Sequence, residues 1–427
     1  MIAPTDVPTP PAPSRHPFPW LPVLILGFAW FLAVAIELGP AGLLNDIARD
    51  LDVSIAAAGT LTTFYALGNA LLVLPLTSFA LRFARRPVLV IVMAALAIST
   101  AAVALSSNLF LADAGRFIGG ASYALICTLF PAVVIRIAGP GNAGKAITVV
   151  FTATSLGTAF GAPLASLVGA ATGWRPTFLG ASVLVAVAGI LMWFVVPRVR
   201  EHTEETLGLL RTARLPGVMR VAIGWSFVML AHFVVLTYID AYLEELGVPR
   251  YITSVALSLT GIGGIIGTLL IGQVSRRSFY AALVVAPITV AIGFIVLIGG
   301  GDAIVVVLVG VALWGIGLAA MVVVYQQGLL LTGARAPETA TSIGVLLAQA
   351  GFAVGASVGG ITIETLGIRA IPAVALIFVI ASIAIALTLR QTITRAQEEE
   401  KARNETENPS ARTVTGARAL MTKRKNR

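Results

Sequence analysis

The sequence predicts an all-α membrane protein with twelve transmembrane helices in two pseudo-symmetric six-helix bundles. The chain has 427 residues, of which 57% are hydrophobic and only 11% are charged, and its mean hydropathy is +0.93. A soluble protein of this size has too little core to bury so many apolar side chains. At about 20 residues per crossing, twelve helices use about 240 residues and leave the rest for short loops and two tails.

The apolar runs give the predicted helices in order. They span residues 20–44, 58–80, 87–107, 109–136, 146–171, 175–197, 220–243, 252–275, 279–299, 303–327, 339–364 and 368–390. Residues 1–19 hold seven prolines and are expected to form a disordered cytoplasmic tail. Residues 20–197 then form the N-terminal bundle, 198–219 a polar cytoplasmic linker, 220–390 the C-terminal bundle and 391–427 a charged cytoplasmic tail.

The two halves carry an internal repeat at an offset of 194 residues. The matching pairs are Gly157 with Gly351, Gly161 with Gly355, Gly173 with Gly367 and Arg175 with Arg369. The pair Arg85-Arg86 after the second span likewise recurs as Arg276-Arg277 after the eighth. Two similar bundles with a site between them at mid-membrane depth are the architecture of a rocking transporter.

The net charge of +9 reflects membrane orientation and does not predict a nucleic-acid partner. Most Lys and Arg residues lie in the two tails and the even-numbered loops, which places both termini in the cytoplasm. The basic run at residues 423–427 is expected to contact anionic lipid headgroups. The single cysteine, Cys127, lies in an apolar run and excludes a disulfide framework or a cysteine-ligated metal site. No cofactor or metal is predicted.

Charged residues within the spans are the leading candidates for function, because an ionised group at a helix centre costs roughly 2.5 to 3.5 kcal/mol. Glu37 in the first span and Arg116 in the fourth lie at similar predicted depths and can face each other. Asp113 precedes Arg116 by three positions and can pair with it. One interpretation is a buried structural ion pair, and the other is a substrate or proton site.

The seventh predicted span contains a second group of candidates. His232 and Asp240 are eight residues apart, on nearly the same face of one continuous helix, with Tyr238 close by. An imidazole changes protonation state in the physiological range, so His232 is either a coupling residue or a hydrogen-bonded helix contact. Asp240 is either a cavity residue or an interfacial acid. The aromatic residues Trp30 and Trp314 line an apolar cavity or simply pack between helices.

The spacing of Gly157, Gly161 and Pro163 permits close helix packing, and in a carrier the bend at the proline can also serve as a hinge. Two soluble-protein motifs are rejected. The segment 139–145 fits a phosphate-binding loop but lacks the Ser or Thr after its lysine, and the glycine-rich segment 261–267 lies inside an apolar span. The three histidines have no metal-binding spacing, and no catalytic cluster occurs, so an enzyme is not expected.

Several motifs together resemble those of the twelve-helix drug:proton antiporter group of the major facilitator superfamily, which includes bacterial sugar, arabinose-type and purine-nucleoside efflux permeases. They are residues 36–54 around Glu37, the loop 82–87, Gly115-Arg116 with Gly119-Gly120, Gly157 to Pro163, Gly173 to Phe178 and Thr237 to Ile239. The resemblance covers residues 20–390. It implies the major facilitator fold and a gating role for Arg82, Arg85 and Arg86. Thr77 and Leu81 depart from the loop motif and put its charge relay in doubt.

The resemblance and Glu37 together predict a plasma-membrane exporter of a small drug-, sugar- or nucleoside-like solute, driven by proton antiport. The expected partners are the solute, protons and the lipid bilayer, and the protein is expected to act as a monomer. Glu37, Asp113, Arg116, His232 and Asp240 are the predicted coupling and cavity residues. The alternatives are an uptake symporter or uniporter, and a non-transporting membrane sensor.

Overall fold

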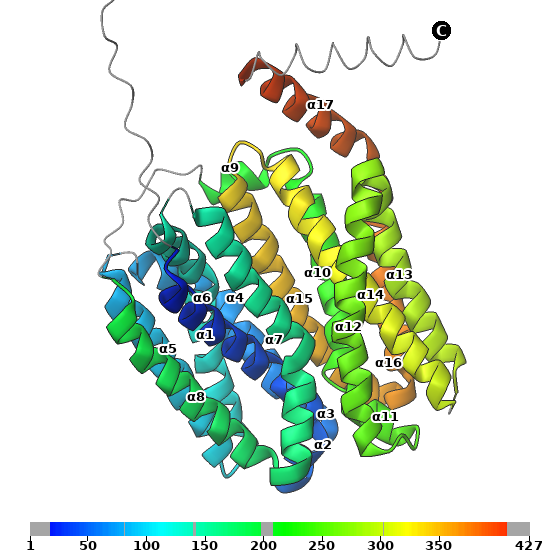
Figure 1. The fold of residues 1–427 in the computed structure, drawn as a ribbon. Coiled ribbons are helices and arrows are strands. Elements are labelled where there is room, and N and C mark those ends of the chain that lie inside the picture. The colour runs from blue at the N-terminus through cyan, green and yellow to red at the C-terminus, as the bar shows by residue number, and fades with distance from the viewer. Residues whose placement is uncertain (1–17, 81, 140–141, 198–207, 302, 408–427) are drawn as a thin grey trace, which may run out of the picture.

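The computed structural model describes residues 18–80, 82–139, 142–197, 208–301 and 303–407, and these residues form helices and no strands (Figure 1). The long helices are α1 (Trp20–Leu38), α4 (Thr60–Ala80), α5 (Arg85–Leu105), α6 (Leu109–Ala138), α7 (Ala143–Thr172), α8 (Trp174–Val195), α10 (Val218–Leu236), α12 (Arg250–Arg277), α13 (Phe279–Gly299), α14 (Ile304–Thr332), α15 (Pro337–Leu366) and α16 (Ile371–Thr388). Twelve helical segments are long and apolar enough to cross a membrane. The predicted fold class and number of spans are therefore confirmed.

Short elements connect these helices or extend them. They are η1 (Gly39–Gly42), α2 (Leu44–Asp50), α3 (Ile55–Ala58), α9 (Leu209–Ala213), α11 (Ile239–Glu245), η2 (Ile368–Ala370) and α17 (Arg390–Glu407). Figure 1 shows α2, α3 and α11 at one end of the molecule, called here the α2–α11 end. The opposite end carries α9, α17 and the start of α1, and is called the α9–α17 end.

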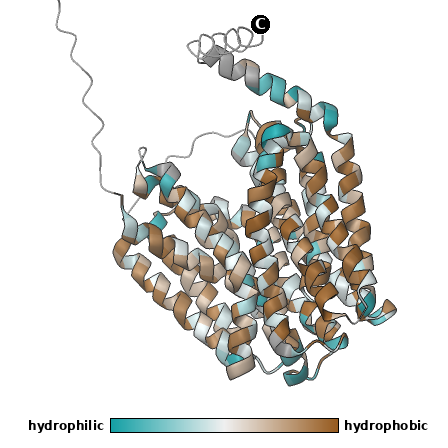
Figure 2. Cartoon of the chain, turned by 45° about the vertical axis from the view of Figure 1, so that its right-hand side comes forward, coloured by the Kyte–Doolittle hydropathy of each residue, from teal (hydrophilic) through white to brown (hydrophobic). Residues whose placement is uncertain are grey.

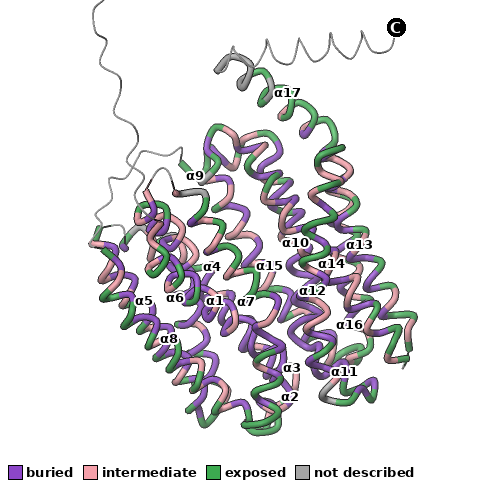
Figure 3. The backbone as a smooth tube through the Cα atoms, viewed as in Figure 1, coloured by how far each residue is buried: buried purple, intermediate pink, exposed green. Residues whose placement is uncertain are grey.

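The outer surface of the helices is apolar, as expected for a protein whose solvent is lipid. Figure 2 shows hydrophobic residues along the length of the helices and hydrophilic ones mainly at the two ends. Many large apolar side chains are exposed between the ends, such as Ile98 of α5 at 70% and Leu269 of α12 at 66%. Figure 3 shows buried residues on the inner faces of the same helices. The spans therefore bury one face against each other and present the other to lipid.

The helices from α1 to α8 pack mainly with one another, and so do those from α10 to α16. The glycine repeat marks equivalent contacts in the two groups. A Cβ at Gly157 or Gly161 would lie within 3 Å of α1, and a Cβ at Gly351 or Gly355 would lie within 3 Å of α10. Glycine is required at these positions because the helix axes approach so closely. Between the groups, α4 packs on α15 and α7 on α12.

In two of the predicted spans, the α-helix ends earlier than the hydropathy predicted. The first ends at Leu38 and not at residue 44, and the seventh ends at Leu236 and not at residue 243. The chain then continues as separate short helices at the α2–α11 end, although apolar residues continue through both breaks. The tail after residue 390 also begins with a helix, α17, which is rich in the helix-forming residues Glu, Gln, Arg and Ala.

Candidate functional site

Glu37 lies at the point where α1 breaks. In a continuing helix, the N–H of residue 40 would bond the carbonyl of Ile36, but Pro40 has no N–H to donate. The helix therefore ends at Leu38, turns through η1 and resumes as α2 at Leu44. The break leaves carbonyl oxygens at the end of α1 that need other donors. The Glu37 side chain is 7% exposed.

Arg116 of α6 supplies those donors. Its Nη1 donates to the Ile36 carbonyl and its Nη2 to the Glu37 carbonyl, both at 2.9 Å, while its Nε donates to the Leu61 carbonyl of α4 at 3.0 Å. The guanidinium also lies over the Tyr65 ring, 4.0 Å from its centroid. The structure thus joins Glu37 and Arg116 through the Glu37 backbone, whereas the sequence predicted contact through opposite charges of the side chains.

Asp113 lies one helical turn from Arg116 but hydrogen-bonds to a different partner. Its Oδ2 accepts a hydrogen bond from the Thr60 hydroxyl at 2.8 Å, and its side chain is 8% exposed. Among the described residues, Asp113 Oδ1 has no hydrogen-bond partner. The hydrogen bonds of Arg116 go to three backbone carbonyls. Asp113 therefore bonds to the Thr60 hydroxyl and not, as expected, to Arg116.

The Glu37 carboxyl faces polar groups from both groups of helices. The side chains of Tyr123 on α6 and Gln349 on α15 lie within hydrogen-bonding reach of it. Tyr65 and Cys127 are close enough to interact with its charge. In the described part of the chain, Glu37 Oε1 and Gln349 Oε1 are both buried without a hydrogen-bond partner. The carboxyl therefore lies where side chains of both groups of helices meet.

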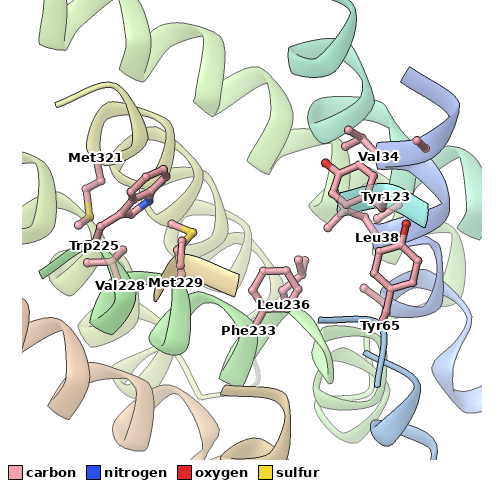
Figure 4. Close-up of a cluster of buried hydrophobic side chains, with 14 of the residues drawn as sticks. Val34, Leu38, Tyr65, Tyr123, Trp225, Val228, Met229, Phe233, Leu236 and Met321 are labelled. Atoms are coloured by element: carbon pink, nitrogen blue, oxygen red, sulfur yellow. The ribbon is translucent and has the colours of Figure 1, made fainter. Parts of the chain in front are cut away.

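His232 lies in an aromatic environment on α10. Its ring centroid is 5.2 Å from that of Trp314 and 5.0 Å from that of Phe233. Within the described residues, His232 Nδ1 and Trp314 Nε1 are buried without a partner. Figure 4 shows apolar side chains of α10, among them Met229 and Phe233, across from Tyr65 and Tyr123 of the first group. Trp30, the other predicted aromatic, packs against Phe130 and Phe151.

The prediction that His232 and Asp240 share one helix face is wrong. The helix α10 ends at Leu236, and Asp240 lies in the first turn of the separate helix α11. Tyr238 lies in the turn between them, where its hydroxyl donates to the Ala356 carbonyl of α15 at 2.8 Å. Asp240 belongs instead to the α2–α11 end, where its Oδ2 accepts from the backbone N–H of Asn45 at 3.5 Å.

The α2–α11 end joins the two groups of helices. Glu244 of α11 accepts hydrogen bonds from Asn45 and Arg49 of α2, the latter at 2.8 and 2.9 Å. These residues, with Asp240, Val248 and Thr253, line a cavity of about 290 Å³. Further inside, Thr63 of α4 bonds to Ser357 of α15 at 3.2 Å, and Ser166 of α7 to Ser254 of α12 at 3.0 Å.

The arginines predicted to act in gating lie at the start of α5. Arg82 is exposed in the turn before the helix, Arg85 is 1% exposed, and Arg86 stacks on the Trp193 ring at 4.5 Å. Leu81, the departure from the family loop, lies outside the described residues. Pro163 lies inside α7, beyond the glycine contacts with α1.

Sequence reasoning missed Gln349, Tyr65 and Tyr123 as neighbours of Glu37. It searched the spans for charges, and these three side chains carry none. Gln349 is nevertheless an uncharged amide inside an apolar span, which is a costly choice unless the amide has a partner. Among the described residues, no group of three or more His, Cys, Asp or Glu side chains could bind a metal ion.

The family of the chain follows from its similarity to known proteins. Residues 20–347 match the Major Facilitator Superfamily. The chain belongs to this superfamily of transporters. The predicted family is therefore confirmed, and the protein is a multi-pass membrane protein of a family whose fold is not that of an enzyme.

Three curated relatives cover most of the chain. The Transcription regulatory protein OpdE of Pseudomonas aeruginosa is 30% identical over 359 residues, covering 82% of this chain and 89% of the relative. Chloramphenicol efflux pumps from two strains of Mycobacterium tuberculosis are each 28% identical over 362 residues, covering 81% of this chain and 88% of the pump.

Solved structures share the fold. A bacterial homolog of the human lysosomal transporter Spinster, in an inward-facing and unoccupied conformation, aligns with a TM-score of 0.73 at 13% identity, covering 90% of this chain and 99% of that one. The human organic anion transporter MFSD10 (TETRAN) aligns with a TM-score of 0.64 at 18% identity, covering 87% and 100%. At these identities the likeness concerns the fold alone.

Proposed function

We propose that this major facilitator superfamily transporter exports a small organic solute in exchange for protons, with Glu37 as the proton site. The observation that carries the proposal is the placement of the Glu37 carboxyl. It is the acidic side chain at the break in α1, it is buried, and it faces Gln349 of the opposite group of helices. A carboxyl in this position can exchange a proton and sense the arrangement of the two halves.

Arg116 is the positioning residue for this site. By bonding the carbonyls of Ile36 and Glu37, it fixes the backbone from which the Glu37 carboxyl projects. Its hydrogen bonds go to backbone oxygens, so the carboxyl itself stays available to a proton or a solute. Proton and solute then compete for one group, which is the requirement for antiport.

The side chains around the boundary suggest an amphipathic solute with an aromatic ring. On one side, Tyr65, Tyr123 and Glu37 offer hydroxyl and carboxyl groups. On the other, Phe233 stacks on Phe352 at 3.9 Å, and His232 lies against Trp314. The two Mycobacterium tuberculosis relatives are chloramphenicol efflux pumps. Chloramphenicol, an aromatic molecule with hydroxyl and amide groups, is therefore the first solute to test.

We further propose that the α9–α17 end is cytoplasmic, as the predicted distribution of basic residues requires. The α2–α11 end then faces outward, and the contacts of Glu244, Thr63 and Ser166 join the halves 20–197 and 220–390 on the outer side. The conformation described is closed to the outside. Rocking of the halves about the site would break these contacts and open the outer end.

Transport in inverted membrane vesicles tests the proposal. A pH gradient, acidic inside, is expected to drive chloramphenicol accumulation in vesicles with the parent protein but not in vesicles with Glu37→Gln. Glu398→Gln, at an exposed position on α17, is the matched control and should accumulate like the parent. Accumulation by Glu37→Gln at the parent rate would contradict the proton role of Glu37.

The same vesicles separate the alternatives. A uniporter would equilibrate the solute without responding to the gradient, and an uptake symporter would respond to a gradient of the opposite sign. A non-transporting sensor would bind solute without moving it; the name of the Pseudomonas aeruginosa relative, Transcription regulatory protein OpdE, is the reason to test for one. Each result would replace export by antiport as the function.

A further inference from the structure

We infer that Gln349 is the residue through which the C-terminal half detects the protonation state of Glu37, an inference that rests on the proposed function. Gln349 lies on α15 and Glu37 on α1, so their contact crosses the boundary between the halves. Its amide has both a donor and an acceptor, and it can therefore respond to a carboxyl in either protonation state.

Gln349 lies on the face of α15 that closes against the first half. Ala353 and Ser357 follow it at successive intervals of four residues, and Gly360 follows three residues later, so the four share one helix face. The Thr63 hydroxyl of α4 bonds to the Ser357 hydroxyl at 3.2 Å and lies 3.4 Å from the Ala353 carbonyl. A Cβ at Gly360 would lie 3.4 Å from the Ala56 carbonyl. Gln349 is thus the inner end of the contact that closes the α2–α11 end.

Two orphan oxygens indicate what a proton would do there. Glu37 Oε1 and Gln349 Oε1 are each buried, and neither has a hydrogen-bond partner among the described residues. When Glu37 is ionised, both oxygens are hydrogen-bond acceptors. The Gln349 amide N–H can then donate one hydrogen bond to the Glu37 carboxylate, but no donor is left for the Gln349 carbonyl oxygen. A proton on Glu37 supplies that donor, because a carboxylic acid donates its O–H to an amide carbonyl.

The other ionisable groups near Glu37 do not take the place of Gln349 beside the carboxyl. Arg116 reaches its backbone, Tyr65 and Cys127 interact with its charge, and Tyr123 lies within hydrogen-bonding reach. The two basic residues of the neighbouring helices α7 and α8 are engaged elsewhere. Lys145 lies over the rings of Phe18 and Trp20, and Arg175 bonds to Asp50. Gln349 is the polar group that reaches Glu37 from α15.

The consequence is a link between proton binding and closure of the outer end. A protonated Glu37 joins Gln349 by two hydrogen bonds and holds α15 against the first half. Release of the proton to the cytoplasm leaves one bond and a buried unpaired oxygen, which costs free energy and favours reopening. The inward movement of a proton thereby sets the order of the conformational steps.

The closure is measured as the distance between two spin labels by pulsed electron spin resonance. The labels are attached to Ser107→Cys and Ala303→Cys on a Cys127→Ala background, and both positions are exposed in loops at the α2–α11 end. Acidification is expected to raise the ratio of closed to open molecules in the parent by roughly threefold to tenfold, the effect of one buried hydrogen bond. Gln349→Met, which keeps the length of the side chain without the amide, should lose this pH response. Gln273→Met, at an exposed position on α12, should keep it.

Two further variants make the result decisive. The exchange Glu37→Gln with Gln349→Glu keeps the same pair of groups and should retain a pH response; a response in Gln349→Met equal to that of the parent, or none in the exchange variant, would overturn the inference. Glu37→Gln alone should favour the closed form at every pH. If Glu37→Gln instead keeps the parent's pH response, Glu37 is not the proton site and the proposed function itself fails.

Discussion

Arg116 donates a hydrogen bond to the backbone carbonyl of Glu37 at 2.9 Å, and not to the Glu37 carboxylate. The guanidinium is 2% exposed and also bonds the carbonyls of Ile36 and Leu61. One arginine thereby ties α6 to the broken end of α1 and to α4. The carboxyl of Glu37 projects from a backbone that Arg116 holds in place by hydrogen bonds to the carbonyl oxygens.

Arg116→Lys is predicted to destabilise the protein although it keeps the charge. A lysine ammonium cannot reproduce the planar fork that reaches three carbonyls, so buried oxygens lose their donors. We expect a loss of about 2 kcal/mol in the free energy of unfolding and a lower midpoint in detergent thermal unfolding. Arg369→Lys, at an exposed arginine beside Glu245, is the control and should change the midpoint little. An unchanged midpoint for Arg116→Lys would show that these bonds contribute little.

Pro40→Ala tests the origin of the break in α1. Alanine restores the N–H that can bond the Ile36 carbonyl, so Arg116 should matter less for stability in this background. We expect Arg116→Met to cost about 1 kcal/mol less in Pro40→Ala than in the parent, measured as a double-mutant cycle by thermal unfolding. Additive effects of the two substitutions would mean that the proline does not create the need for Arg116.

Glu244 and Glu245 are adjacent but contact different halves, which makes them a matched pair. Glu244 accepts from Asn45 and Arg49 across the boundary, whereas Glu245 lies 3.7 Å from Arg369 in its own half. Glu244→Gln should weaken the closed outer end, by less than about 1 kcal/mol because the pair is exposed. Reaction of Thr253→Cys, on a Cys127→Ala background, with an impermeant maleimide added outside should then accelerate up to about fivefold. Glu245→Gln should leave the rate unchanged, and equal rates in both variants would contradict the assignment.

The contact between α7 and α12 depends on Gly261. A Cβ there would lie 2.4 Å from the Ala159 carbonyl, whereas a Cβ at Gly272 on the same helix meets nothing within 4 Å. Gly261→Ala should therefore separate the two helices and reduce transport at least about tenfold, and Gly272→Ala should transport like the parent. The rate of chloramphenicol accumulation in inverted vesicles that contain equal amounts of each variant checks both expectations. Equal rates for the two alanine variants would show that the close approach is not needed during the cycle.

The fold was largely predictable because lipid imposes long apolar runs that hydropathy reads directly. The breaks after Leu38 and Leu236 were not, since apolar residues continue beyond both and only the proline at position 40 hinted at the first. The glycine repeat correctly located equivalent contacts with α1 and α10. The contact of Asn45 with Glu244 joins residues 199 positions apart, and a single sequence gives no signal for such a pair. Gln349 carries no charge, so the high cost of ionised groups in lipid, which points to Glu37 and Arg116, gives no signal for it.

Proton release on solute binding tests the central claim most directly, because it requires neither a membrane gradient nor a direction of transport. Purified protein in weakly buffered detergent solution receives chloramphenicol, and the pH is followed with an indicator dye. If solute and proton compete for Glu37, the parent releases protons in proportion to the solute bound and Glu37→Gln binds without release. Binding by the parent with no proton release, or equal release by Glu37→Gln, would contradict the account.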